Sequence, residues 1–269
     1  MNRPTFDNPV YRLDLRVRVR ERRLWVLALF FLLVPLTLSM LALPVVDTFS
    51  SLAHATPYTD AAGMLAGFAL FGHGALLVLL SALAAAQRIS QERERRTLPA
   101  LVNSPLSAAR IADGKLLGAW TFDLWLATLT LPFLAVATLW GGVSFGRLLL
   151  AWALNVAAAF AVSSFALGLS GLFGRSLSAY LATGAALFLW CVVVPIAGAM
   201  ACGMLDLNGD TAFAVTLWHL PLAPQAWVFS EGFGGSVGAL MPCVGLAVWV
   251  AIGFAGRALA IRGLRREVF

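Results

Sequence analysis

Charge is scarce in this chain. Asp, Glu, Lys and Arg together make up 12% of its 269 residues, whereas an ordinary soluble domain carries about 25%. This shortage excludes a disordered protein and a soluble enzyme. It also excludes a nucleic-acid-binding domain despite the net charge of +6, because the cationic residues occur in a few blocks between long uncharged stretches and do not spread over one surface.

Lysine and cysteine are also rare. Lys115 is the only lysine, and Leu116 follows it. The phosphate-binding motif Gly-x-x-x-x-Gly-Lys-Ser/Thr therefore does not occur, so we expect no ATP hydrolysis by this chain. The three cysteines, Cys191, Cys202 and Cys243, match no zinc or redox spacing. We interpret them as small apolar side chains, and a Cys202–Cys243 bridge is the alternative.

Apolar residues, by contrast, account for 60% of the chain, and the mean hydropathy is +0.85. A membrane span needs about 20 residues of this kind. We therefore predict an all-α integral membrane protein with a single transmembrane domain and six spans, at residues 24–46, 61–86, 116–140, 147–173, 177–203 and 237–255. The remaining parts are a leader at 1–23, a connecting segment at 87–115, a second connection at 204–236 and a tail at 256–269.

The cationic residues divide unequally between the two sides of such a protein. Eighteen of the 19 Lys and Arg residues lie in the leader, in the connecting segment, at Arg175 or in the tail, and Arg147 alone lies on the other side. Loops rich in Lys and Arg stay in the cytoplasm. We therefore expect a multi-pass protein with both termini and the connecting segment in the cytoplasm, and with residues 204–236 on the outer side.

The leader allows two interpretations. Residues 12–20 alternate strictly between charged and apolar side chains, which favours a strand. A lone strand would leave its backbone groups unpaired, whereas a helix places Val10, Leu13, Val17 and Leu24 on one face. We expect an amphipathic helix at the membrane interface, held by apolar burial and by anionic lipid headgroups. A basic leader that only sets the orientation is the alternative.

The connecting segment has a helical pattern with two interruptions. Arg88, Glu92 and Arg96 follow one another at intervals of four residues, so we expect them to pair along one helix face. Thr97 is a candidate N-cap for a short second helix, which ends before Pro105. Ser107 is a candidate N-cap for a third helix that continues into the next span.

The short second helix carries an apolar face made of Leu98, Leu101 and Val102. Exposed apolar residues between charged ones indicate a surface for a partner. We therefore expect these three side chains to contact a protein outside the membrane. The alternative is a solvated hairpin that only joins two spans.

At these residues the chain resembles the type-2 ABC exporter permease family, and most closely its drug, lipid and copper-enzyme-maturation branch. Elements of that family's first cytoplasmic connection occur here in order: Glu92 and Glu94, Thr97 with Leu98, Pro105 to Ser107, Ile111, and Gly114 with Lys115. Arg96 stands where the family usually has glycine. The layout of six spans behind a basic leader extends the resemblance over the whole chain.

The resemblance implies a permease subunit in the bacterial cytoplasmic (inner) membrane. Two permease copies, identical or closely related, would form the channel, and separate ATPase subunits would bind ATP and Mg. The chain itself would hold no cofactor. Its partners would be the ATPase subunits, the second permease copy and the lipid bilayer, with no nucleic acid. Short re-entrant helices within residues 204–236 would dip into the outer leaflet.

The resemblance also implies how the two subunits are coupled. A coupling helix, at about Thr97–Asn103, would sit in a groove on the ATPase, with charge pairs from the neighbouring residues fixing its position. The residues given this role are Glu92, Glu94, Thr97, Leu98, Leu101, Val102, Pro105, Ser107 and Lys115.

Polar residues inside the spans are costly in a membrane and therefore deserve an interpretation. Asp123 and Asn155 are candidates for a polar transport pathway, and hydrogen bonding between neighbouring helices is the alternative that we favour. His73 has no Cys or carboxylate beside it in the sequence, so we expect a packed histidine and no metal site. Two other functions compete with transport: a passive membrane scaffold and, less favoured, an intramembrane enzyme.

Overall fold

A computed structural model of the chain describes residues 8–19, 25–26, 28–33, 37, 57–132, 135, 144–205 and 236–266. Every regular element among these residues is a helix, which confirms the all-α prediction. The predicted first span at 24–46 and the connection at 204–236, with its expected re-entrant helices, lie mostly outside the described residues. Residues 133–134 and 136–143, which belong to the third predicted span and the turn after it, also lie outside the described residues.

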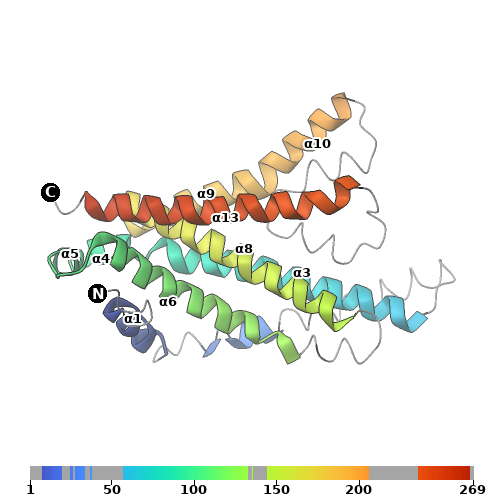
Figure 1. Cartoon of the computed structure of the whole chain (residues 1–269), viewed down its shortest axis with the longest axis horizontal. Helices are drawn as coiled ribbons and strands as arrows, with labels where there is room; N and C mark the ends of the chain where they lie inside the picture. Colours follow the sequence, from blue (N-terminus) through green and yellow to red (C-terminus); the bar gives the residue numbers. More distant parts are fainter. Residues whose placement is uncertain are drawn as a thin grey trace.

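The helices follow one another as labelled in Figure 1. They are α1 (Pro9–Val19), α3 (Pro57–Ala86), α4 (Ser90–Glu94), α5 (Leu98–Val102), α6 (Ala108–Thr128), α8 (Phe145–Leu172), α9 (Ser176–Phe188), α10 (Val194–Met204) and α13 (Ser236–Arg265). A single π-helical turn, η2 (Leu189–Val193), joins α9 to α10. We call the continuous helix from Ser176 to Met204 the α9–α10 arm.

Among the described residues, four helical stretches are long and apolar enough to cross a membrane: Gly72–Glu94, Leu148–Leu172, Ser176–Met204 and Gly245–Arg265. Two boundaries differ from the sequence prediction. Helix α3 already begins at Pro57, and α13 continues to Arg265. The expected sixth span and most of the expected tail therefore form one helix, because Ala260 and Leu264 in its last turns are buried against the bundle.

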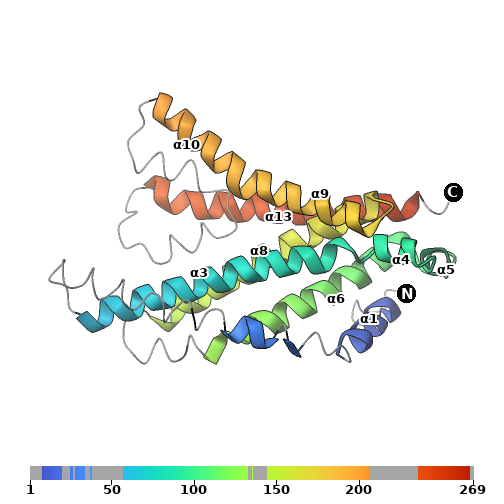
Figure 2. The ribbon, with the colours of Figure 1, turned by 180° about the vertical axis from the view of Figure 1, so that it is seen from behind.

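Helix α8 is the centre of the bundle, where it packs against α3, α6, α9 and α13 (Figure 2). Its contact with α13 is the most extensive, and small residues make it close. A side chain at Gly256 would come within 2.4 Å of the Ser164 carbonyl oxygen, and one at Gly263 within 2.3 Å of the Gly171 carbonyl oxygen. Small residues at such crossings let two helix backbones touch.

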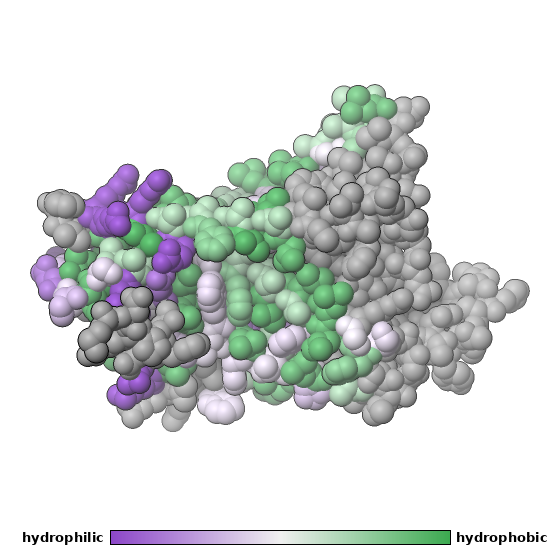
Figure 3. Space-filling view, in the orientation of Figure 1, coloured by the Kyte–Doolittle hydropathy of each residue, from purple (hydrophilic) through white to green (hydrophobic). Residues whose placement is uncertain are grey.

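The outer surface of the described chain matches a protein embedded in lipid. Hydrophilic side chains gather at the end that carries α1, α4 and α5, while apolar side chains cover the middle of the molecule (Figure 3). Of the four stretches long enough to cross a membrane, the α9–α10 arm is the least buried, with Leu181 exposed by 65% and Met200 by 62%. Figure 2 shows α10 diverging from α13, so this arm has a large apolar surface outside the bundle.

Candidate functional site

The connecting segment forms one end of the molecule. Helices α4 and α5 lie there together with α1, the first turns of α6 and the end of α13 (Figure 1). The helix of the span before it stops at Ala86, and α4 begins only at Ser90. The segment therefore runs through two short helices, α4 and α5, before α6 begins at Ala108.

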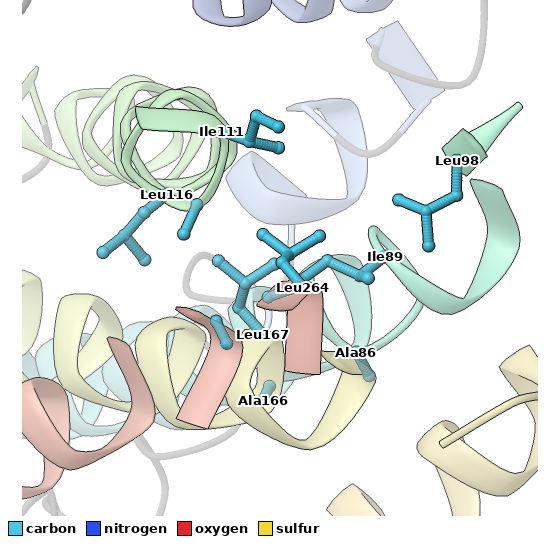
Figure 4. Packing of buried hydrophobic residues seen from close by; sticks show 11 residues of the cluster. Ala86, Ile89, Leu98, Ile111, Leu116, Ala166, Leu167 and Leu264 are labelled. Atoms are coloured by element: carbon cyan, nitrogen blue, oxygen red, sulfur yellow. The ribbon is translucent and has the colours of Figure 1, made fainter. Parts of the chain in front are cut away.

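Leu98, on the apolar face of α5, packs inward, which corrects the sequence interpretation for this residue. Leu98 is completely buried, and in Figure 4 it lies beside Ile89 within an apolar cluster at this end of the bundle. Leu101 and Val102 are half-buried against the same cluster. Leu98 cannot contact a partner, because the chain's own core already covers it. The cluster consists of Ala85, Ala86, Ile89, Leu98, Ile111, Ala112, Leu116, Ala166, Leu167, Ala260 and Leu264.

The opposite face of this region is open to solvent. The exposed residues are Glu94, Arg95, Arg96, Thr97, Pro99, Ala100 and Asn103. They surround a short helix whose inner side is fixed in the apolar cluster. The structure thus presents the α4–α5 turn and the outer face of α5 as an exposed surface above a packed apolar cluster.

The turn between α4 and α5 has the backbone that a glycine would favour. Arg96 has a φ of 58° and is the one residue other than glycine with positive φ in the described chain. The backbone N–H of Arg96 donates to the carbonyl oxygen of Arg93, and that of Thr97 donates to Glu92. These two bonds are the pattern of a Schellman helix end. Thr97 makes no side-chain cap bond for α5, because its hydroxyl donates to the Glu92 carbonyl at 3.2 Å.

Arg88 pairs with α1 and Glu92 pairs with α6, so the predicted row of Arg88, Glu92 and Arg96 is wrong. Lys115 donates to Glu92 at 2.5 Å and to the Arg88 carbonyl oxygen at 3.2 Å. Arg88 in turn donates to the Lys115 carbonyl at 2.7 Å and forms an ion pair with Asp14 at 2.8 Å. Because α3 ends at Ala86, Arg88 is outside the helix that the spacing rule requires.

A second group of bonds joins the connecting segment to the turn between α8 and α9. The Ser170 hydroxyl accepts from the backbone N–H groups of Ile89 and Ser90, each at 3.0 Å. Arg93 donates to the carbonyl oxygens of Phe173 and Gly171 at the end of α8. Glu94 therefore lies at the start of α9, where its carboxylate accepts from Ser176.

The chain between α5 and α6 carries the remaining motif residues. Pro105 is exposed, and the Ser104 hydroxyl donates to the Leu101 carbonyl at 2.6 Å. Ser107 caps α6, since its hydroxyl accepts from the backbone N–H of Arg110 at 3.3 Å. The first contact lies at the end of α5, and the second lies at the start of α6. Ser104 and Ser107 thus fix the path of the backbone at this end of the bundle.

Sequence reasoning missed how α1 joins this site. Asn8 donates to the Arg110 carbonyl at 2.7 Å and caps α1 by accepting from the Val10 N–H at 3.0 Å. Val10 is buried by the chain itself, whereas Leu13, on the same side of α1, is 66% exposed. The usable signal was Asn8 before Pro9, since asparagine is a preferred N-cap and proline a preferred first helical residue.

The candidate pathway residues lie inside the bundle. Asp123 and Asn155 are buried, and the Asn155 amide donates to the Leu70 carbonyl of α3 at 3.2 Å. His73 is buried too, with its ring edge-on to Phe31 and its Nε2 3.5 Å from the Thr130 hydroxyl. These placements favour contacts between helices of one subunit. Within the described residues, no group of three or more His, Cys, Asp or Glu could hold a metal ion.

Long apolar helices and a cationic end together indicate a multi-pass membrane protein. A model of the ABC-2 family transporter proteins matches residues 9–213 of the chain. Because the match covers most of the chain, the protein belongs to the ABC-2 transporter family and is a membrane permease component of an ABC transporter. No curated protein matches the chain.

Proposed function

We propose that this chain is the permease subunit of an ATP-driven exporter and that a separate ATPase subunit supplies the energy. The absence of a phosphate-binding Gly-Lys-Ser/Thr motif in the sequence supports a separate ATPase. The solvent-exposed outer face of α5, whose inner face is packed in the apolar cluster, supports a docking surface for it. The family assignment supports transport over a passive scaffold or an intramembrane enzyme.

The proposal includes the arrangement in the membrane. Six spans place both termini and the connecting segment in the cytoplasm of a bacterium, with the chain in the inner membrane. The common location of α1, α4, α5 and the end of α13 at one end of the molecule supports this orientation. Two permease copies, identical or closely related, form the channel, and the exposed α9–α10 arm leaves apolar surface for such a contact.

The docking surface that we propose is the outer face of α5 and the preceding turn, with Thr97, Pro99, Ala100 and Asn103 facing the ATPase. Leu98 holds this helix to the core. A movement of the ATPase against the outer face therefore moves α5 together with the apolar cluster below it. Since that cluster contains residues of α6, α8 and α13, the movement reaches several spans at once.

The observation that carries this proposal is the exposure of Ala100 opposite the buried Leu98. Ala100→Glu places a charge on the outer face without entering the core. We expect this variant to lose co-purification of the ATPase encoded with the permease, while membrane insertion and the melting temperature stay unchanged. Arg265→Gln is the control, because it also changes the charge by one unit at an exposed position of the same end.

Retention of the ATPase and of its stimulation by the permease in Ala100→Glu would move the docking surface to another part of the chain. If the unaltered permease neither binds nor stimulates an ATPase, the chain is a scaffold. Measuring ATP hydrolysis in both preparations separates these outcomes.

A further inference from the structure

Glu94 binds the first residue of α9 through two hydrogen bonds. Its Oε1 accepts from the backbone N–H of Ser176 at 2.9 Å, and its Oε2 accepts from the Ser176 hydroxyl at 2.5 Å. The first N–H groups of a helix have no partner within the helix, and a negative charge there is favourable because of the helix dipole. Glu94 therefore supplies a hydrogen-bond acceptor and a negative charge at the start of α9.

Arg93, the residue before Glu94, makes the complementary contact with the end of α8. The guanidinium of Arg93 donates to the carbonyl oxygens of Gly171 and Phe173. The last carbonyl groups of a helix also lack partners, and cations are favourable near them. Two consecutive residues of α4 thus match the two helix ends on either side of the α8–α9 turn. Arg93 bonds only backbone carbonyl groups, and Glu94 bonds only the N–H and hydroxyl of Ser176. These bonds therefore position the backbone of the α8–α9 turn.

The helix that starts at Ser176 packs against α8 and α3 along α9, whereas its second half is largely exposed. Ala179 and Thr183 are its buried residues in α9. Farther along, Trp190 stacks on Trp249 of α13 with ring centroids 5.0 Å apart, but from residue 192 to residue 201 most side chains are exposed. The exposed second half therefore follows α9, which is bonded to Glu94 at Ser176 and packs against α8 and α3, and the π-helical turn at Leu189–Val193 adds a site where the two halves can bend.

We infer that Glu94 is the positioning residue through which the connecting segment moves the α9–α10 arm. This inference rests on the proposed function, because the ATPase at the outer face of α5 supplies the movement. Glu94 lies just before the α4–α5 turn, so the turn and the start of α9 move as one unit. The exposed arm then shifts relative to α13 while the tightly packed pair of α8 and α13 stays together.

The contact can be removed from either side. Glu94→Ala deletes the acceptor, and Ser176→Pro deletes the backbone N–H. Proline fits this position because it is favoured at the first residue of a helix. It also requires an extended residue before it, and Arg175 has φ −120° and ψ 142°. Ser176→Ala keeps the N–H and removes the hydroxyl bond alone.

The measurement uses the full-length permease with its ATPase in liposomes, after Cys191, Cys202 and Cys243 are replaced by alanine. Spin labels at Leu181 and Phe254, exposed by 65% and 69%, report the distance between α9 and α13. Double electron–electron resonance compares the nucleotide-free complex with the complex trapped by ADP and vanadate. We expect the distance to shift between these states in the protein without further changes.

In Glu94→Ala and in Ser176→Pro we expect this shift to be lost, while the ATPase still co-purifies. The double variant should behave like either single variant, because both changes remove the same contact. Ser176→Ala should keep part of the shift. Asp113→Asn is the matched control: it breaks the ion pair of Asp113 with Arg257, at 2.6 Å, which joins α6 to α13 at the same end, and should leave the shift intact.

Several results would overturn the inference. These are a full shift in Glu94→Ala, a larger loss in the double variant than in either single one, or no shift in the unaltered complex although the ATPase is bound. An unaltered permease that does not retain the ATPase overturns the proposed function, and this inference with it. The co-purification measurement therefore distinguishes the two failures.

Discussion

Replacing Gly256 by alanine should force α8 and α13 apart. A Cβ at this position would lie 2.4 Å from the Ser164 carbonyl oxygen and 2.5 Å from the Phe165 nitrogen. Both are backbone atoms of α8, so no side chain can turn away to make room. The two helices would have to separate by about 1 Å to restore an ordinary contact distance, and the contacts on both sides of Gly256 would loosen with them.

The magnitude follows from two opposing effects. Inserting a methyl group into a well-packed core costs about 1–3 kcal/mol. Alanine favours a helix over glycine by about 1 kcal/mol in water, but separated helices in a membrane remain helical because their backbone groups have no water to bond. This offset is therefore smaller in the bilayer. We expect Gly256→Ala to lower the free energy of unfolding by about 1–3 kcal/mol.

A series of glycine replacements provides the controls. Outside the glycine's own helix backbone, the nearest atom to an added Cβ is 3.3 Å away at Gly171 and 3.6 Å away at Gly253, and none lies within 4 Å at Gly184. The loss of stability should decrease in the order Gly256, Gly171, Gly253, with no loss at Gly184. Unfolding by sodium dodecyl sulfate in mixed micelles measures it. Equal midpoints for Gly256→Ala and Gly184→Ala would refute the reasoning.

Three further predictions concern the connecting segment and the topology. Leu98→Ala should lower the free energy of unfolding by about 2–5 kcal/mol, because the side chain is fully buried; an unchanged unfolding midpoint would contradict the packing. Arg96→Gly should raise it by about 1 kcal/mol, since a residue with a side chain is strained at φ 58°; thermal unfolding checks the sign. Reporter fusions after Ser51, Ser104 and Gly234 should lie outside, inside and outside the cell, and an outside signal at Ser104 would reverse the orientation.

Local sequence patterns predicted the helical fold well. Runs of about 20 apolar residues have one stable backbone in a membrane, so the class follows from composition alone. The N-cap at Ser107 is also a local feature, since its hydroxyl bonds the N–H three residues later. The glycine-like turn at Arg96 could be found through the family pattern, because that pattern has glycine at the position whose φ is positive here.

The side-chain partners could not be predicted in the same way. Spacing along a helix suggested that Arg88 pairs with Glu92, but burial against α1 and α6 gives each a partner far away in the sequence. The apolar face of α5 was recognised, whereas its direction depends on the bundle below it. An amphipathic pattern shows that one face is covered. It does not show whether the same chain or another protein covers it, as Leu98 illustrates.

The burial of Lys115 has a practical consequence for chemical labelling. It is the only lysine in the sequence, and its side chain is 5% exposed between the Glu92 carboxylate and the Arg88 carbonyl. Apart from the amino terminus, amine-reactive reagents therefore find no accessible target on the folded permease. Acylation of this one ε-amino group becomes possible when α4 separates from α6. When the reagent reacts faster than the site closes again, the rate of acylation at Lys115 equals the rate at which this end of the molecule opens, measured at a single site and without any engineered residue.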